Sequence, residues 1–178
     1  MKLIEPEIRL LTATDAESFW HLRLEALRND PASFADSTEE HQSTTVEAAR
    51  ERLSSGDPAT NFVVGMFEEG RLTATAGFYR SHHNKERHKG HIWGVYVRPE
   101  SRGKGVARAL MQEIIRRARS INGLEQVLLV ASTHLPARKL YESLGFQAYG
   151  VEPRSLKIIT KTGTEYVDDV LMVLDIRP

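Results

Sequence analysis

The chain has 178 residues, of which 40% are apolar and 27% charged, and this length and mixture suit one globular domain with a full core. Its 24 basic and 24 acidic residues cancel, which argues against a dedicated nucleic-acid-binding protein. The absence of cysteine excludes disulfides, thiolate metal ligands and a cysteine nucleophile. The segment MKLIEPEIRLL is too short and too acidic for a signal peptide, and no apolar run is long enough to span a bilayer, so we expect a cytoplasmic protein.

The first third of the chain predicts one strand followed by two helices. Residues 7–15 are typical of a short strand with a polar end. Over residues 12–27 apolar side chains recur with helical spacing on one face. The segment NDPASF, residues 29–34, breaks this helix, and a second helix is expected over residues 44–56.

The middle of the chain changes to the periodicity of strands. Residues 61–80 form two apolar, β-branched runs joined at Glu69-Gly70, which predicts a hairpin. A polar, histidine-rich loop follows over residues 81–90, and HIWGVYV, residues 91–97, predicts a third strand. Strict alternation along that strand places the side chains on two faces, one with His91, Trp93, Val95 and Val97 and the other with Ile92, Gly94 and Tyr96.

The rest of the chain alternates helices and strands. A helix is expected from the glycine-rich stretch that follows to about Ile121, and the apolar run 125–132 is typical of a buried central strand. A short helix over 136–146 and two strands at 146–153 and 166–176 complete the pattern. The order strand, two helices, three strands, helix, strand, helix, two strands indicates an α/β domain of the mixed α+β kind, with no internal repeat or linker.

The stretch RPESRGKGVARALM, residues 98–111, places two glycines directly before a helix, which is typical of phosphate binding. It lacks the Gly-x-x-x-x-Gly-Lys-Ser/Thr of a P-loop, and Arg108 occupies the place of the third glycine of a dinucleotide fingerprint. A third interpretation remains open, in which backbone N–H groups at the helix N-terminus hold a pyrophosphate. The glycines would allow close approach, and Arg102 and Lys104 would add charge. The alternative is a plain strand-to-helix turn.

Two motifs in this half of the chain carry a resemblance to a known family. VYVRPESRGKGVARALM resembles the acetyl-CoA motif Arg/Gln-x-x-Gly-x-Gly/Ala of the GNAT superfamily of N-acetyltransferases, with Arg102, Gly105 and Ala107 at its fixed positions. ARKLYESLGF resembles the family's Ala-x-x-Leu-Tyr-Glu-x-x-Gly-Phe signature. One predicted helix and one predicted strand separate the motifs, as in the family, and the order of elements is also that of the family.

This resemblance implies acetyl-CoA as cosubstrate, bound along the strand that precedes the loop. In such folds that strand diverges from its neighbour and its backbone pairs with the pantetheine arm, and a backbone N–H near Val95 polarises the thioester carbonyl. The implied cofactor-binding residues are Val95, Tyr96, Val97, Arg102, Gly103, Lys104, Gly105, Val106, Ala107, His134 and Tyr141. The implied fold is one GNAT-like domain over residues 1–178, with a central, mostly antiparallel twisted sheet of about seven strands and four flanking helices.

The same resemblance suggests the catalytic groups. Tyr141 matches the tyrosine that acts as general acid in many relatives, and a phenol can donate a proton to a departing thiolate; a packed aromatic is the other interpretation. Many relatives have a glutamate base where this sequence has HKGHIWG, so His91 is the candidate general base, directly or through water, with a more distant solvent chain left open. His134 replaces an asparagine of the family motif, which leaves its contact with the cofactor open.

The acceptor is expected to be a primary amine of a small molecule or of a peptide or protein N-terminus. In this fold the first two helices and the last hairpin form its cleft, with candidate lining or core residues Phe34, Trp20, Tyr79, Trp93 and Tyr166. The acidic segment 30–40 can attract a cationic amine or be a solvated loop. We expect no metal, nucleic-acid or membrane partner, and a homodimer is left open. The alternative functions are a catalytically silent acetyl-CoA-binding sensor or partner-binding domain, and a nucleotide-binding α/β domain.

Overall fold

The computed structural model describes residues 6–133, 136–160 and 162–177, in which seven strands form one sheet of order β1-β2-β3-β4-β5-β7-β6. Neighbouring strands run antiparallel except for β4 and β5, which are parallel. The predicted α/β class with a mostly antiparallel sheet is therefore confirmed. The strands are β1 (Glu7–Leu10), β2 (Asn61–Glu68), β3 (Arg71–Arg80), β4 (Lys89–Val97), β5 (Gln126–Ser132), β6 (Gln147–Thr160) and β7 (Gly163–Asp175).

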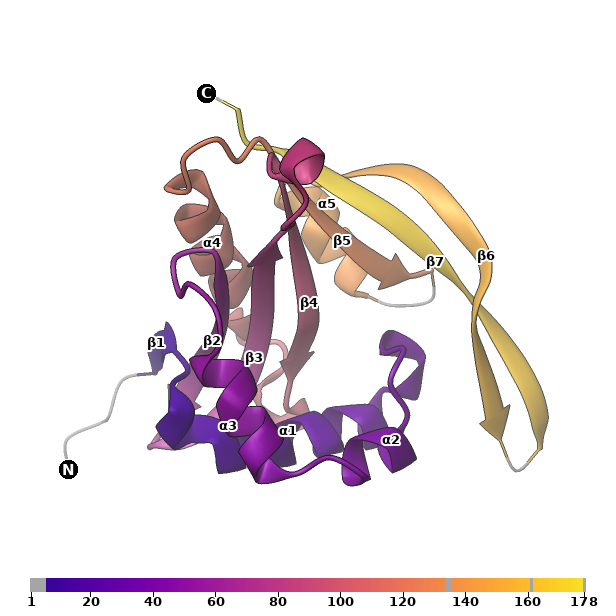
Figure 1. The fold of residues 1–178 in the computed structure, drawn as a ribbon. Helices are drawn as coiled ribbons and strands as arrows, with labels where there is room; N and C mark the ends of the chain where they lie inside the picture. The colour runs from indigo at the N-terminus through magenta and orange to yellow at the C-terminus, as the bar shows by residue number, and fades with distance from the viewer. Residues whose placement is uncertain (1–5, 134–135, 161, 178) are drawn as a thin grey trace.

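Helices cover both faces of the sheet (Figure 1). They are α1 (Ala16–Asn29), α2 (Thr38–Gln42), α3 (Val46–Ser54), α4 (Val106–Arg119) and α5 (Ala137–Ser143). Helices α1 and α3 pack on one face, and α4 and α5 pack on the other. The four main helices follow the predicted order, and the five-residue α2 is an addition. Within the described residues, no helix combines the length and the apolar character needed to cross a membrane.

Each face of the sheet has its own hydrophobic cluster. On one face, Leu110, Met111 and Ile114 of α4 are fully buried against the strands. On the other face, Leu22 and Leu27 of α1 are buried in a second cluster. Because helices cover both sides, β2 and β3 are buried along nearly their whole length, and apart from Thr73 and Thr75 their buried residues are apolar.

The β2–β3 hairpin turns at Glu69-Gly70, as predicted. Both residues adopt left-handed backbone conformations, with φ of +50° and +80°. This is the geometry that two-residue hairpin loops require, because it matches the twist of the flanking strands.

Strand β4 departs from the predicted alternation at Gly94. Its register with β3 shifts between Trp93 and Tyr96, so that Gly94 and Val95 together stand opposite one β3 residue. Gly94 has a φ of +63°, and this arrangement is a β-bulge. Trp93 and Tyr96 therefore pack with the α1 cluster, whereas Val95 and Val97 pack with the α4 cluster. The predicted grouping of Trp93 with Val95 and Val97 is wrong, because the bulge moves the later side chains to the opposite face.

The N-terminal elements differ from the prediction in two places. The first strand ends at Leu10 rather than at residue 15, because the Asp15 carboxylate accepts hydrogen bonds from the Thr12 N–H and from Arg9, each at 2.8 Å, and the chain turns there. Helix α2 begins with a capping box between Ser37 and Glu40. It buries no residue, so it has no apolar periodicity from which it could be predicted.

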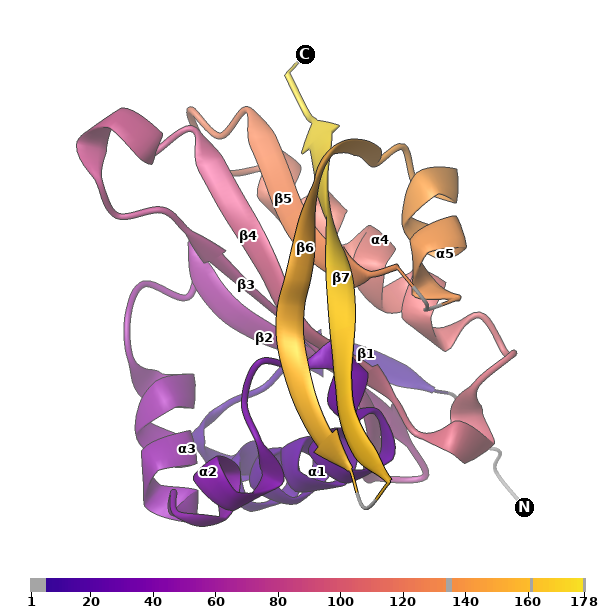
Figure 2. The same cartoon turned by 90° about the vertical axis from the view of Figure 1, so that its right-hand side faces the viewer.

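The β6–β7 hairpin is longer than predicted. Strand β6 continues well past Pro153, and β7 begins at Gly163. A proline is tolerated there because β6 is the edge of the sheet, and a register shift around Arg154, with φ +55°, accommodates it. The hairpin extends down to the level of α1 and α2 (Figures 1 and 2), and β6 contacts the 3-10 turn Pro31–Ser33 that follows α1.

Candidate active site

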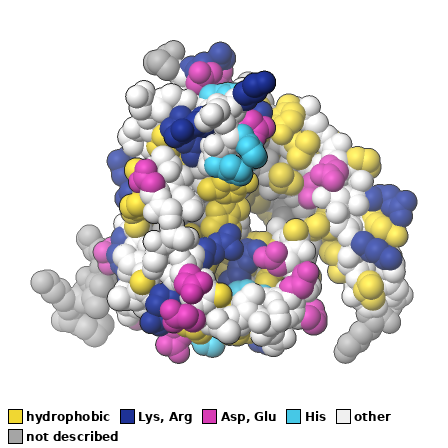
Figure 3. All heavy atoms as spheres, in the orientation of Figure 1, with side chains coloured by type: hydrophobic (Ala, Val, Ile, Leu, Met, Phe, Trp, Pro, Cys, Tyr) yellow, Lys and Arg dark blue, Asp and Glu magenta, His cyan; other side chains and the backbone are white. Residues whose placement is uncertain are grey.

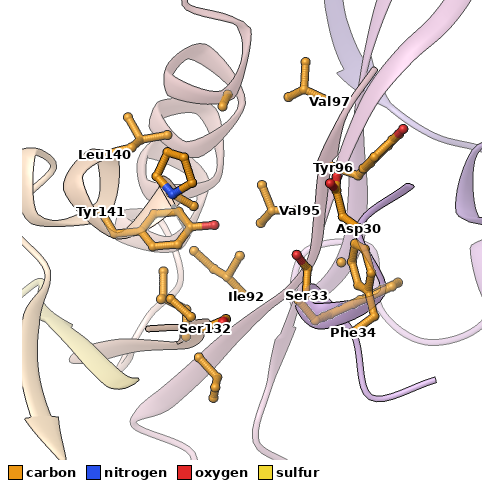
Figure 4. Close-up of a pocket in the computed structure, with 18 of the residues that line it drawn as sticks. Asp30, Ser33, Phe34, Ile92, Val95, Tyr96, Val97, Ser132, Leu140 and Tyr141 are labelled. Atoms are coloured by element: carbon orange, nitrogen blue, oxygen red, sulfur yellow. The ribbon is translucent and has the colours of Figure 1, made fainter. Parts of the chain in front are cut away.

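Strands β4 and β5 separate partway along their length. In the described part of the chain their parallel register runs from Lys89 opposite Gln126 to His91 opposite Leu128, and it ends there. Beyond this point a cavity of about 350 Å³ opens between the strands, closed on its other sides by α5 and by the segment after α1 (Figure 4). Its apolar lining includes Phe34, Ile92, Trp93, Val95, Val97, Leu129, Ala131, Leu140 and Tyr141.

The bulge at Gly94 decides which β4 side chains face this cavity. Val95 projects into it toward Tyr141, and Tyr96 points away (Figure 4). The Tyr96 hydroxyl accepts a hydrogen bond from Asn29 Nδ2 at 2.9 Å and donates one to Glu25 at 3.1 Å, both on α1. Burial raises the pKa of Tyr96 to about 12. The Tyr96 side chain therefore fastens β4 to α1, and its backbone is the part left at the cavity.

The glycine loop takes the left-handed backbone conformation at both of its glycines. Gly103 has a φ of +75° and Gly105 a φ of +82°. A Cβ atom at either position would meet nothing within 4 Å. Glycine is therefore favoured here by the left-handed backbone conformation rather than by close packing, and the space beside the loop is open. Gly105 is the N-cap of α4, whose first backbone N–H groups and positive dipole end favour an anion.

A second hollow of about 210 Å³ lies beside this loop, between Ser101, Gly103, Gly105 and the start of α4. It shares Val97, Arg102, Ala107 and Leu140 with the cavity between the strands. The two hollows therefore adjoin and form one path from the gap between β4 and β5 to the N-terminus of α4. An elongated molecule with an apolar arm and an anionic end fits this arrangement.

The other loop residues have distinct surroundings. Arg102 is partly exposed, and its guanidinium donates to the Val97 carbonyl at 2.9 Å and to Asp30 at 2.5 Å. Lys104 is exposed. The Val106 side chain is buried in the α4 cluster, so its backbone alone can serve a ligand, whereas Ala107 lines both hollows.

Tyr141 lies on α5 with its ring buried and its hydroxyl directed into the cavity (Figure 4). The ring packs edge-on against Phe146, with 6.2 Å between centroids. Burial raises the pKa of Tyr141 to about 12, so the phenol stays protonated at neutral pH. The two interpretations of this residue are compatible, because the ring belongs to the core and the hydroxyl reaches the cavity.

His91 lies in the part of β4 that is still paired with β5, and it does not line the cavity. Its Nε2 is 3.0 Å from the Ser81 hydroxyl, and its ring stacks on Tyr79 with centroids 4.9 Å apart. Burial lowers the pKa of His91, which favours the neutral imidazole. His134, the other histidine that the sequence suggested, lies outside the described residues.

The structure adds polar residues that the sequence motifs did not single out for this cavity. Asp30 and Ser33 follow α1 and line one side, and Ser132 at the end of β5 lines another. Asp30 belongs to the acidic segment 30–40 that the sequence offered as an amine-attracting surface. No local pattern marks Ser33 and Ser132 as cavity residues, because they meet only through the tertiary fold. Gly94 did carry a signal, since an isolated glycine inside a strand pattern is typical of a bulge.

Comparison with known proteins identifies the class to which this fold and site belong. A model described as the acetyltransferase (GNAT) family matches residues 20–146, and the chain belongs to this family. The chain is 36% identical over 127 residues to a mycothiol acetyltransferase of Thermobispora bispora, covering 67% of this chain and 41% of that protein. It is 43% identical over 53 residues to an uncharacterised N-acetyltransferase of Schizosaccharomyces pombe, covering 30% of this chain and 32% of that one. The chain thus matches less than half the length of these curated relatives.

Solved structures share the whole fold. An acetyltransferase of the GNAT family from Streptococcus pneumoniae superposes with a TM-score of 0.83 at 20% identity, covering 97% of this chain and all of that one (100%). The putative acetyltransferase yncA from Salmonella typhimurium, solved with acetyl-CoA, gives a TM-score of 0.77 at 23% identity and covers 98% of this chain and 95% of that one. At these identities the likeness establishes the fold, and the predicted seven-stranded GNAT-like architecture is confirmed.

Proposed function

We propose that this chain is an acetyl-CoA-dependent N-acetyltransferase that moves an acetyl group to a primary amine of a small molecule or of a peptide or protein N-terminus. The observation that carries the proposal is the path from the apolar cavity between β4 and β5 to the glycine loop at the start of α4. Membership of the acetyltransferase family and the relative solved with acetyl-CoA support it.

Acetyl-CoA would lie along β4 and reach the start of α4. Beyond His91 the β5-facing edge of β4 has no register partner in the described segments, and the backbone of Val95, Tyr96 and Val97 is the proposed partner of the pantetheine arm. The loop from Arg102 to Ala107 is the proposed cradle of the pyrophosphate, because its glycine conformations and the helix N-terminus favour a dianion.

The protein's own groups then have three tasks: to polarise the thioester carbonyl, to protonate the departing thiolate and to take the proton of the amine. Acetyl-CoA, when bound, supplies the acetyl group as a thioester. A backbone N–H near Val95 is proposed to polarise the carbonyl, in a cavity whose apolar walls strengthen such a hydrogen bond. Tyr141 is the proposed general acid, because its hydroxyl enters the cavity and holds its proton at neutral pH.

His91 remains the proposed general base. Its lowered pKa keeps it able to accept a proton near pH 7, and its ring lies on the strand that walls the cavity. Because it does not line the cavity, it would take the amine proton through water rather than by direct contact. His134 stays a proposed cofactor contact.

An acceptor screen with acetyl-CoA tests the proposal. The protein is incubated with acetyl-CoA and a broad panel of amines, amino acids and peptides, release of the free CoA thiol is followed, and products are identified by mass spectrometry. We expect thiol release with at least one amine and a product heavier by one acetyl group. Calorimetric binding of acetyl-CoA without any turnover would instead favour the alternative of a silent acetyl-CoA sensor.

A further inference from the structure

Two arginines contact aromatic residues that line the cavity. The guanidinium of Arg23, on α1, lies over the Phe34 ring with 4.7 Å to its centroid, and that of Arg52, on α3, lies 4.0 Å from the centroid of Trp93. Phe34 and Trp93 both line the cavity, and Phe34 stands across it from Tyr141 (Figure 4). Figure 3 shows basic side-chain atoms within the hollow between the helices and the last hairpin.

Arg23 is only partly satisfied. Its side chain is 15% exposed, and its Nη2 donates to Asp36 at 2.8 Å. Its Nη1 is buried and has no hydrogen-bond partner among the described residues. Buried charged donors are nearly always paired, because an unpaired one would have lost its hydrogen bonds to water without gaining an acceptor. An unpaired guanidinium nitrogen here marks a place for an acceptor that the chain itself does not supply.

Arg52 adds a second cation nearby, in a neighbouring hollow that shares Trp93 with the cavity. It makes no ion pair in the described part of the chain, and it remains open to solvent, so a ligand can reach it. Partial burial lowers the pKa of Arg52, and repulsion from the charge of Arg23 lowers it further. The negative charge of Asp36 opposes both effects. Asp36 forms an ion pair with Arg23, and Arg52 has no such partner among the described residues, so this pair of guanidinium groups keeps a net positive charge.

The position of Arg23 relates this pair to the proposed transfer site. A Cβ atom built on Gly94 would lie 3.3 Å from Arg23 Nη1. Gly94 lines the cavity and directly precedes Val95, whose backbone is the proposed partner of the acetyl carbonyl. An anionic group held by the arginines would therefore sit next to the place where the acceptor nitrogen must arrive.

We propose that Arg23 and Arg52 bind an oxyanion, in the first instance a carboxylate, carried by the acceptor close to its amine. This inference rests on the proposed function and narrows it: the acceptor is an amino-acid-like amine rather than a polyamine. Planar guanidinium groups suit a carboxylate because they can offer two parallel N–H donors. Within the acidic segment 30–40, Asp30 and Asp36 are already paired with arginines, so these two carboxylates are not free to attract a cationic amine.

Matched acceptors test this inference on the intact protein. Each α-amino acid is compared with its primary carboxamide, with the amine that lacks the carboxyl group, and with the aminophosphonate of the same side chain. We expect kcat/KM for the preferred acid to exceed that of its carboxamide by about tenfold or more, since a polar site rejects an analogue that leaves its groups unpaired. The aminophosphonate distinguishes a general oxyanion site, which accepts it, from one shaped for a carboxylate.

Variants show whether the arginines cause the preference. Arg52→Met keeps an unbranched side chain beside Trp93 and removes the charge. Arg23→Lys keeps a charge and removes the planar guanidinium with its parallel N–H donors. Both should reduce the acid-to-carboxamide ratio by about tenfold without changing acetyl-CoA affinity measured by calorimetry. Arg50→Met is the matched control, because Arg50 is exposed on α3 and pairs with Glu47. It should leave the ratio unchanged.

The outcomes separate the two proposals. Acetylation of acids and carboxamides at equal rates would overturn the oxyanion site and leave the acetyltransferase activity standing. If no amine is acetylated, the activity fails, and binding of the amino acids to the CoA-loaded protein is then measured by calorimetry. Amino-acid binding that is present in the wild type and in Arg50→Met but lost in Arg52→Met would support the oxyanion site. Equal binding by the wild type and both variants would overturn it.

Discussion

Arg102 joins the end of α1 to the end of β4, because its guanidinium donates to Asp30 at 2.5 Å and to the Val97 carbonyl at 2.9 Å. All three residues line the cavity between β4 and β5. The arginine of the acetyl-CoA motif is thus held in place by the protein's own groups. It sets the position of the glycine loop relative to the strand that the pantetheine arm is proposed to follow.

Replacing Arg102 by Gln should weaken acetyl-CoA binding more than it weakens the fold. The pair with Asp30 is partly exposed, so its loss should cost about 1 kcal/mol or less in the free energy of unfolding. Loss of hydrogen bonds from a charged group that positions the loop should lower acetyl-CoA affinity by about tenfold in calorimetry. Arg119→Gln removes one exposed charge from the far end of α4 and is the control. Equal affinity in both variants would contradict the role assigned to Arg102.

Gly105→Asp should abolish acetyl-CoA binding while the protein stays folded. The left-handed conformation costs a side chain about 1–2 kcal/mol, and a carboxylate at the start of α4 repels a pyrophosphate. Gly70→Asp is a closely matched control, because Gly70 has a φ of +80° and, like Gly105, no neighbour within 4 Å of a Cβ atom. In thermal unfolding Gly105→Asp should lose no more stability than Gly70→Asp, because a carboxylate at the N-cap of α4 is favourable for the helix. Only Gly105→Asp should lose calorimetric binding, and retained binding would exclude this loop as the pyrophosphate site.

Tyr141→Phe should lower kcat by about a hundredfold and leave acetyl-CoA affinity within about twofold, because general acids typically contribute 10²–10⁴-fold. The ring and its contact with Phe146 remain, so packing is preserved. Steady-state kinetics with the acceptor found by the screen measures the first effect, and calorimetry the second. A loss of binding with unchanged kcat would assign the residue to packing.

The raised pKa of Tyr141 also predicts the direction of its effect on stability at high pH. The folded state holds the phenol proton up to about pH 12, whereas an unfolded tyrosine releases it near pH 10. The contribution is therefore fully present below pH 10 and is lost as the pH rises from there toward 12. Thermal unfolding between pH 9 and 11 should show a smaller alkaline loss in Tyr141→Phe than in the wild type. An identical loss would mean that burial of this phenol does not shift its pKa.

His91→Gln should remove the acid limb of the pH–rate profile if His91 is the base. A protonated imidazole cannot accept a proton, and burial lowers its pKa, so in the wild type activity should rise with pH through a midpoint below the ordinary value of about 6.5. Ser81→Ala removes the hydroxyl beside Nε2 and should move this midpoint without removing the limb. An unchanged acid limb in His91→Gln would assign the base to another group or to solvent.

The elements that the sequence predicted well are those with local causes. The Glu69-Gly70 turn, the apolar stripe of α4 and the glycine N-cap of α4 depend on neighbouring residues, and the structure has each of them. Helix α2 lacks an apolar face, and the far half of β6 is exposed on the sheet edge, so neither carries a periodic signal. Their form depends on capping and on pairing with β7.

The same division holds for the site. The acetyl-CoA motif and the tyrosine motif are local and could be placed from the sequence. The cavity itself depends on where β4 and β5 stop pairing, and the two arginines behind its Phe34 and Trp93 come from two different helices. Contacts between residues from different elements follow from the tertiary fold and leave no local pattern. Along β4, strict alternation predicted the wrong faces for Val95 and Val97, because the bulge interrupts it.

The bulge can be tested at Gly94. Gly94→Ala places a side chain in a left-handed conformation, which costs about 1–2 kcal/mol, and its Cβ atom would lie 3.3 Å from Arg23 Nη1. Gly123→Ala is a close control, because Gly123 has a φ of +73° and its Cβ atom would lie 3.4 Å from an Arg80 nitrogen.

Both variants should therefore lower the melting temperature by a similar amount, about 2–8 °C for a chain of this size. Only Gly94→Ala should also lower kcat/KM for the acceptor, by about tenfold or more, because a displaced bulge moves Val95 and the Arg23 guanidinium relative to each other. Wild-type kcat/KM in Gly94→Ala, at a melting temperature equal to that of Gly123→Ala, would show that the reaction does not depend on the geometry of this bulge.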